Sequence, residues 1–160
     1  MNKEVYNVQN PAIGAAILWR FICGYKSKDN KPTPFPLLFI VLPIIFREDL
    51  CAVIKSTQKK KGLSKVSEKL FDGKKIDELY SINNSAIEMR SLTLASFNVG
   101  ILSNIFKMDY EKALVYALID TNKSVFASST KYLLDSAEKL GAWCSELTLL
   151  EISEWLKVRF

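Results

Sequence analysis

The chain has 160 residues, 49% of them apolar, and a formal net charge of +5. This length and apolar content exclude a disordered chain and fit one compact domain over residues 1–160. The sequence has no histidine, which excludes histidine metal ligands, Ser-His and Cys-His nucleophile pairs and imidazole acid–base catalysis. The six glycines are scattered singly, so there is no glycine-rich phosphate loop. We therefore expect no catalytic residues, no cofactor and no metal.

The basic charge is concentrated in residues 55–75, which hold eight lysines and two acidic residues. The cysteines Cys23, Cys51 and Cys144 are far apart in apolar surroundings. This favours buried free thiols in a reducing compartment over a disulfide framework. Residues 1–9 are polar and mixed in charge, without the pattern of a secretory signal. We expect a cytoplasmic protein that does not bind a membrane.

Asn10 and Pro11 are typical of a helix start. They predict a helix from Ala12 to Cys23, with Gly24 placed to end it. This helix is apolar around most of its circumference, so we expect it to be buried or docked against a partner. Arg20 is the exception and is expected to extend to solvent or pair with an acidic residue.

Residues 34–46 form the most apolar segment of the chain, without a charged side chain. Burial of each large side chain is worth roughly 1.5–3 kcal/mol, whereas a helix that crosses a bilayer needs about 20 apolar residues. The segment therefore predicts a central core element. Unbroken apolarity does not distinguish a helix from a strand. Pro43 would kink a helix or confine a strand to the edge of a sheet. We favour a helix from Pro36 to Phe46, because residues 47–54 continue with helical periodicity.

Residues 59–62 predict a loop, followed by a helix that Ser64 caps and that runs through Phe71 to close near Gly73. The candidate contacts for phosphate or an acidic partner surface are Lys59, Lys60, Lys61 and Lys65. A solvated loop is the favoured interpretation. No aromatic residue is interleaved with the lysines, so a platform for stacking bases is not supported.

Residues 75–92 have the periodicity of a helix, and Thr93 and Gly100 are placed to cap and stop a short helix over residues 94–99. Two apolar runs, 101–106 and 112–118, then flank a short polar turn. They predict either a β-hairpin or two helices, and residues 112–118 are compatible with both.

A helix, a short helix and a hairpin follow each other in a winged-helix unit, which can enter a DNA groove. Residues 94–99 contain no Arg, Lys or Gln to contact a base edge. Such a shape would therefore favour protein contact. We expect one mainly helical, α+β domain with a small β-hairpin and a winged-helix-like arrangement as one option.

Residues 128–130 supply caps for a helix whose apolar face holds Leu133, Ala137, Leu140 and Cys144. Gly141 within this pattern indicates close packing or a helix end. Thr148 and Glu151 form a capping box. It opens a last helix, for which we expect inward-facing side chains at Leu149, Ile152, Trp155 and Leu156. Residues 157–160 are expected to be short and extended.

Few residues are candidates for chemistry. The carboxylate pairs at Glu48 and Asp49, Asp77 and Glu78, and Asp109 and Glu111 occur in charged contexts typical of solvated faces. Cys51 and Cys144 have no candidate base, so a thiolate nucleophile is poorly supported. Arg90 lies on a largely apolar helix. It is either a structural ion-pair partner or an interface anchor, where arginine is over-represented.

Several stretches, taken in order along nearly the whole chain, resemble the middle component of bacterial three-component ABC ATPase systems. They include residues 10–12, 36–43, 100–102, 139–143 and 149–159, together with Arg90 before Leu92-Thr93. The motif positions with an expected structural role are Asn10, Pro11, Pro43, Gly100, Leu140, Gly141 and Trp143. Residues 46–51 depart from the family, which has Thr-Arg and a further proline there, so the resemblance does not define the shape of this segment.

The resemblance implies a non-enzymatic subunit that bridges an SMC-like ABC ATPase and a third component, in a conflict or antiviral defence system. The alternative is a DNA-binding accessory domain that uses the basic segment 55–75. An enzyme without histidine is a third hypothesis, which requires a buried carboxylate or lysine cluster in a cleft.

Overall fold

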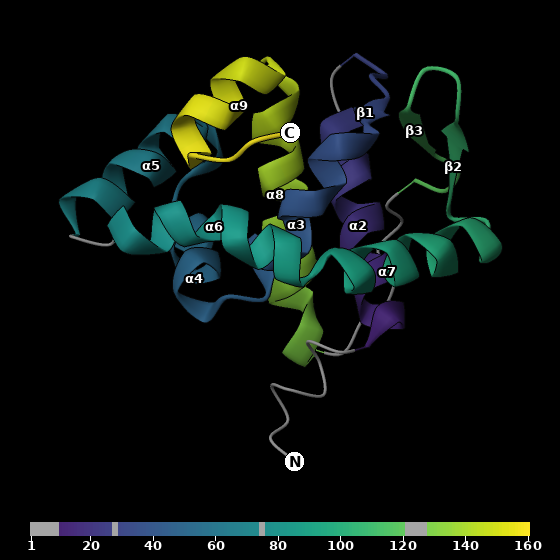
Figure 1. The fold of residues 1–160 in the computed structure, drawn as a ribbon, viewed down its shortest axis with the longest axis horizontal. Coiled ribbons are helices and arrows are strands. Elements are labelled where there is room, and N and C mark those ends of the chain that lie inside the picture. Colours follow the sequence, from purple (N-terminus) through teal and green to yellow (C-terminus); the bar gives the residue numbers. More distant parts are fainter. Residues whose placement is uncertain (1–9, 27–28, 74–75, 121–127) are drawn as a thin grey trace.

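The computed structural model describes residues 10–26, 29–73, 76–120 and 128–160. Helices make up most of it, and a small antiparallel sheet lies at one end (Figure 1). The mainly helical, α+β fold is therefore confirmed. The elements are α2 (Pro11–Lys26), β1 (Thr33–Pro34), η1 (Phe35–Ile40), α3 (Val41–Ile45), α4 (Glu48–Ser56), η2 (Lys59–Lys61), α5 (Gly62–Asp72), α6 (Ile76–Glu88), α7 (Arg90–Leu102), β2 (Phe106–Asp109), β3 (Leu114–Ala117), α8 (Ser128–Ser145) and α9 (Leu149–Leu156).

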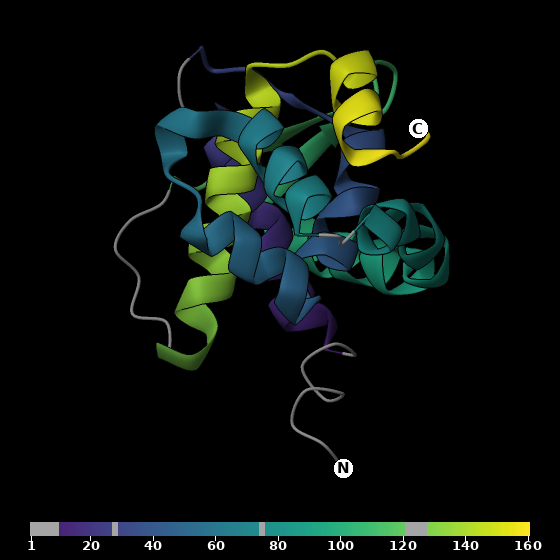
Figure 2. The same cartoon turned by 90° about the vertical axis from the view of Figure 1, so that its left-hand side faces the viewer.

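Helices α2 and α8 lie side by side at the centre of the molecule (Figure 1 and Figure 2) and make its most extensive contact. A Cβ atom at Gly24 would lie 2.0 Å from the carbonyl oxygen of Glu138, and one at Gly141 would lie 2.1 Å from that of Phe21. The two backbones thus approach to a distance that only glycine permits. The prediction that Gly24 ends the first helix is wrong, because this glycine serves the helix crossing and α2 continues to Lys26.

Two predictions about the first helix are confirmed. The Asn10 side chain accepts a hydrogen bond from the Ala12 backbone N–H at 2.9 Å, which caps the helix start. The Arg20 guanidinium pairs with Asp135 at 2.9 Å and with Glu138 at 2.6 Å, both on α8. Arg20, the cation in the middle of this apolar helix, therefore adds two ion pairs to its contact with α8.

The apolar segment 34–46 is buried as expected, but it is not one helix. It forms the end of β1, the 3₁₀ helix η1 and the short α-helix α3. In a continuous α-helix the missing N–H of Pro43 would have bonded to the Phe39 carbonyl, and the change from 3₁₀ to α geometry falls within that turn. Arg47 is then extended, with φ −86° and ψ 117°, and separates α3 from α4. The continuous periodicity across Phe46 was thus misleading.

Strands β2 and β3 form the predicted hairpin, which excludes two helices at this point. Phe106 pairs with Ala117, and Asp109 pairs with Leu114. The two-residue strand β1 adds to β3 in the order β1-β3-β2 and was not predicted. Helices α6 and α7 precede the hairpin in the order expected of a winged-helix-like unit.

Three further predicted helix boundaries are wrong. Ser64 lies inside α5 and does not cap it. Thr93 and Gly100 lie inside α7, because the chain between Ile76 and Leu102 divides at Met89, with φ −92° and ψ 7°. The break thus follows a local change in backbone angles at a residue whose side chain carries no turn signal.

The two C-terminal helices follow the predicted pattern closely. Helix α8 continues through Gly141, which serves close packing, and residues 128–130 form its first turn. The capping box is confirmed, because the Thr148 N–H donates to the Glu151 carboxylate at 2.7 Å and the Glu151 N–H donates to the Thr148 hydroxyl at 3.2 Å.

Helix α9 packs on α5 and α6 along a narrow face. Ile152 and Leu156 are buried there, as expected. The prediction that Leu149 and Trp155 also face inward is wrong, since 37% and 42% of their surfaces are exposed. Lys157 then adopts a left-handed conformation with φ 55°, after which Val158 is buried against the core.

Candidate partner-binding groove

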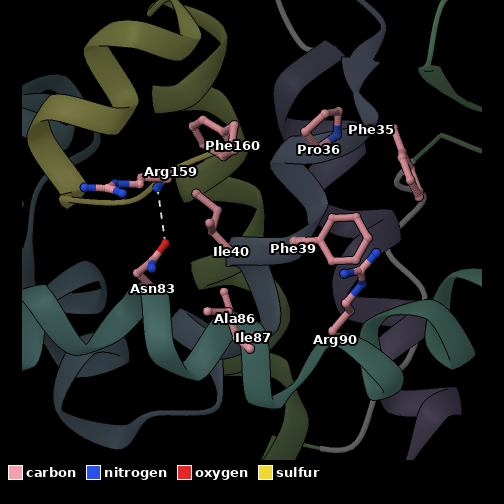
Figure 3. A pocket seen from close by; sticks show the side chains of 10 residues that line it. All are labelled: Phe35, Pro36, Phe39, Ile40, Asn83, Ala86, Ile87, Arg90, Arg159 and Phe160. Atoms are coloured by element: carbon pink, nitrogen blue, oxygen red, sulfur yellow. Dashed lines mark hydrogen bonds between the residues drawn. The ribbon is translucent and has the colours of Figure 1, made fainter.

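An open groove of about 370 Å³ lies between η1, α6 and the last residues of the chain (Figure 3). Three segments that are distant in the sequence build it, and most of its lining is apolar. The lining residues are Phe35, Pro36, Phe39, Ile40, Asn83, Ala86, Ile87, Arg90, Arg159 and Phe160. Its volume falls within the range of sites that take ligand side chains or small molecules.

A chain of aromatic contacts fixes the η1 wall of the groove. The Phe35 ring packs edge-on against the rings of Phe39, at a centroid distance of 5.3 Å, and of Phe97, at 5.1 Å. Phe97 packs in turn against Phe106 at 5.3 Å. This arrangement ties the groove wall to α7 and β2 and is typical of stable aromatic clusters.

The opposite wall consists of α6 and the chain end. The Asn83 side-chain oxygen accepts a hydrogen bond from the Arg159 backbone N–H at 3.2 Å, drawn as a dashed line in Figure 3. The burial of Val158 and this bond hold the chain end against α6. Two apolar side chains remain open to solvent here, since Ile87 is 67% and Phe160 46% exposed.

Arg90 is the first residue of α7 and lines the groove. Its guanidinium group points toward the Phe39 ring in Figure 3. Within the described part of the chain no ion pair involves Arg90. The structure therefore places this candidate residue at an open surface next to apolar side chains.

The candidate lysines lie elsewhere. Lys59, Lys60 and Lys61 form the exposed turn η2, and Lys65 pairs with Glu68 at 2.9 Å on α5. None of the four lines the groove. The structure thus does not bring the lysines and Arg90 together.

Hydrogen bonds from α8 hold the backbone around η2. The Trp143 indole N–H donates to the Lys59 carbonyl oxygen at 2.7 Å. The Lys139 ammonium group donates to the carbonyl oxygens of Ile54 at 3.1 Å, Lys55 at 3.2 Å and Thr57 at 3.0 Å. The lysine turn is therefore anchored to α8 while its side chains face solvent.

A family comparison covers the whole chain. The family described as ABC-three component (ABC-3C) system Middle Component 3 matches residues 1–160. The chain belongs to this family. No curated protein and no solved structure gives a significant match.

The positions that carried the resemblance to middle components lie within the helical framework of the described structure. Asn10 and Pro11 begin α2, Pro43 lies in α3 and Gly100 in α7, and Leu140, Gly141 and Trp143 lie in α8. A Cβ atom at Gly100 would lie 2.0 Å from the Phe106 ring, so this glycine admits the aromatic cluster behind the groove.

The thiols of this middle component are buried and free. Burial, with a smaller effect from the Glu138 carboxylate, raises the pKa of Cys23 to about 12. Burial also raises the pKa values of Cys51 and Cys144. Since the thiolate is the nucleophilic form, none of the three is activated at neutral pH.

Two further findings concern the described residues alone. They contain no group of three or more His, Cys, Asp or Glu side chains placed to hold a metal ion. None of their helices has the length and apolarity needed to span a membrane.

Sequence analysis identified one groove residue, Arg90, and missed the apolar ones. Phe35 and Phe39 belong to a segment that is apolar throughout, so the pattern does not separate residues that face the core from those that face the groove. Ile87 is part of the regular apolar periodicity of α6. The available signal at the chain end was the single Arg159-Phe160 pair that follows Val158.

Proposed function

We propose that this middle component is a non-catalytic adaptor that links the ABC ATPase of its system to the third component. The ATPase would be SMC-like, and the assembly would act in the cytoplasm in conflict or antiviral defence. Membership of a family of subunits of a multi-component ABC system implies partner proteins. The buried thiols and the lack of a metal-binding cluster among the described residues favour binding over catalysis.

The open groove is the observation that carries this proposal. Exposed apolar surface of this kind is typical of protein interaction sites. Its walls are held by aromatic contacts and by the Asn83 hydrogen bond, so a partner would meet a preformed surface and little ordering cost would oppose binding. Ile87 and Phe160 offer the exposed apolar side chains that a partner would bury.

The test compares two variants of equal exposure. Ile87→Gln removes an apolar side chain of the groove that is 67% exposed, and Leu150→Gln removes one on α9 that is 69% exposed and lies outside the groove. Full burial of such a side chain is worth roughly 1.5–3 kcal/mol, which corresponds to a factor of about 10 to 100 in affinity. We expect Ile87→Gln to weaken binding to the co-expressed ABC ATPase or third component by that factor, and Leu150→Gln to leave it unchanged.

Binding is measured by co-purification and then by titration of the purified subunits. A protein that associates with neither system component would contradict the adaptor role. If Ile87→Gln and Leu150→Gln changed the binding affinity equally, the docking site would lie outside the groove.

A second candidate function is DNA binding through the basic segment 55–75. The observation that favours it is the anchored turn η2, which presents Lys59, Lys60 and Lys61 to solvent from a fixed backbone. Such a surface would bind duplex DNA with an affinity that falls steeply with salt concentration. The triple change of these lysines to Glu should abolish duplex binding in a fluorescence titration at low salt, and unchanged binding would rule out this site.

A further inference from the structure

The groove combines an apolar floor with positive charge. Of its ten lining residues, the charged ones are Arg90 and Arg159, and both are basic. In Figure 3 the Arg90 side chain rises beside Phe39, whereas the Arg159 side chain points along the chain end, away from Arg90. Arg90 is thus the charged side chain that a molecule lying along η1 and α6 would meet.

Any segment that binds in the groove would lie against this guanidinium group. The described residues give it no acidic partner, so a purely apolar segment would bury an unpaired charge, which is unfavourable. A basic segment would be repelled. An acidic side chain would form a charge-assisted and often bidentate pair with the guanidinium group, while apolar neighbours of that acid would cover Ile87 and Phe39.

From this charge complementarity we infer that the groove binds a protein segment in which an Asp or Glu lies next to large apolar side chains, and that Arg90 selects the acid. The inference rests on the proposed adaptor function and names the chemistry of the segment that the partner presents. A nucleic acid fits less well, because protein affinity for nucleic acid depends on many phosphate contacts, whereas the groove offers one guanidinium group, that of Arg90, beside its apolar side chains.

The experiment uses a displayed library of random 14-residue peptides, selected on the full chain. Selected peptides are synthesised, and their affinities are measured by fluorescence anisotropy for the wild type and for Arg90→Glu, Ile87→Gln and Lys112→Glu. Lys112 is an exposed cation in the hairpin turn that does not line the groove. Its backbone N–H donates to the Asp109 carboxylate at 3.2 Å, and no described contact involves its side chain. Thermal unfolding checks that each variant is folded.

We expect the selected peptides to be enriched in Asp or Glu beside Leu, Ile or Phe. Arg90→Glu should weaken their binding about tenfold or more, because it replaces attraction by repulsion, and Lys112→Glu should change it by less than about twofold. Replacing the acidic residue of a peptide by Lys should restore its binding to Arg90→Glu.

Each of the following outcomes would contradict a specific part of the inference. Peptides that lose affinity with Ile87→Gln but keep it with Arg90→Glu would leave the docking groove standing and refute the acidic partner. A selection that yields no peptide dependent on Ile87 would refute both. Displacement of the peptides by a single-stranded oligonucleotide at equal concentration would show that the site takes phosphate, which also refutes the inference.

Discussion

Gly141 lies where α8 crosses α2, and its hydrogen takes the place in which a methyl group would touch the Phe21 carbonyl oxygen at 2.1 Å. In an unconstrained helix, Gly→Ala stabilises by about 1 kcal/mol. Here the added methyl must push the two backbones apart, and overpacking of this kind costs about 1–3 kcal/mol. We predict that Gly141→Ala lowers the free energy of unfolding in urea. A gain in stability would show that the helices can separate without cost.

Asp49 is a second residue with a testable role, because its surroundings make the stability of the fold depend on pH. Burial alone would raise the pKa of this carboxyl group, but hydrogen bonding with the Glu78 side chain, together with donation from the Arg47 guanidinium group and the Leu50 backbone N–H, outweighs burial and lowers the pKa below its usual value. Arg47 contacts Asp49 at 3.2 Å and also donates to the Ser81 hydroxyl and the Glu78 carbonyl on α6. The ionised Asp49 therefore helps to hold α4 against α6.

A carboxyl group with a lowered folded pKa stabilises the fold above its unfolded pKa, near 4, and this contribution is lost as the pH falls through the folded pKa. We predict that Asp49→Asn destabilises the protein at pH 7 by about 1 kcal/mol, the scale of one hydrogen-bonded contact. The difference between the two proteins should shrink as the pH falls below about 4. Urea unfolding at pH 7, 5 and 3 measures it, and a constant difference would contradict this assignment.

At the scale of elements, the C-terminal end of α4 depends on a cation from another helix. The last carbonyl groups of a helix lack intrahelical partners. The Lys139 ammonium group on α8 binds the carbonyl oxygens of Ile54 and Lys55 in the last turn of α4 and of Thr57 directly after it, and the Ile54 oxygen also accepts the Thr57 N–H at 3.2 Å. Burial and the nearby Lys69 lower the pKa of Lys139. The Lys69 ammonium group itself donates to the Thr57 hydroxyl at 3.0 Å.

We predict that Lys139→Met destabilises the protein by about 1–2 kcal/mol, because it leaves these carbonyl groups without their charged donor. Lys131→Met is the matched control, since Lys131 is exposed on the same helix and no described contact involves its side chain. Its unfolding midpoint should stay within error of the wild type. Equal midpoints for both variants would show that water replaces the ammonium group without cost.

Elements with a periodic pattern or a cap could be predicted from the sequence, while those set by tertiary contact could not. The Asn10 start and the Thr148 capping box rest on local hydrogen bonds that short motifs encode. The hairpin was one of two interpretations of residues 101–118, and the structure decides in its favour. The strand β1 exists because β3 lies beside it, and a segment of two residues that includes Pro34 has no strand signature. The boundary at Met89 likewise has no local signal.

The candidate groove was less predictable than the fold. Its walls come from η1, α6 and the chain end, and the sequence does not show that these meet. Arg90 was identified because a cation on an apolar helix is unusual, whereas Ile87 matches the same periodicity as the buried residues of α6. Exposure of an apolar side chain depends on what lies opposite, which only the folded arrangement defines.

At the scale of the whole molecule, the core joins residues from nearly every described element. Helix α8 has 18 residues and contributes buried side chains to this core, among them Leu134, Ala137, Leu140 and Cys144. We predict that a chain that ends at residue 127 shows no cooperative unfolding transition by circular dichroism. A chain that ends at residue 147 keeps α8, lacks α9 and should retain a transition at lower urea concentration. A cooperative transition in the shorter chain would contradict the central role of α8.

The pairing of α2 with α8 also has a consequence for biosynthesis. Helix α2 ends at Lys26 and α8 begins at Ser128, so roughly 100 residues separate the two halves of the central contact. At translation rates of about 5–20 residues per second, the apolar α2 leaves the ribosome about 5–20 seconds before its partner. During that interval its surface is available to chaperones or to the same segment of another nascent chain. The close helix crossing that defines the finished molecule therefore makes its core one of the last parts to close.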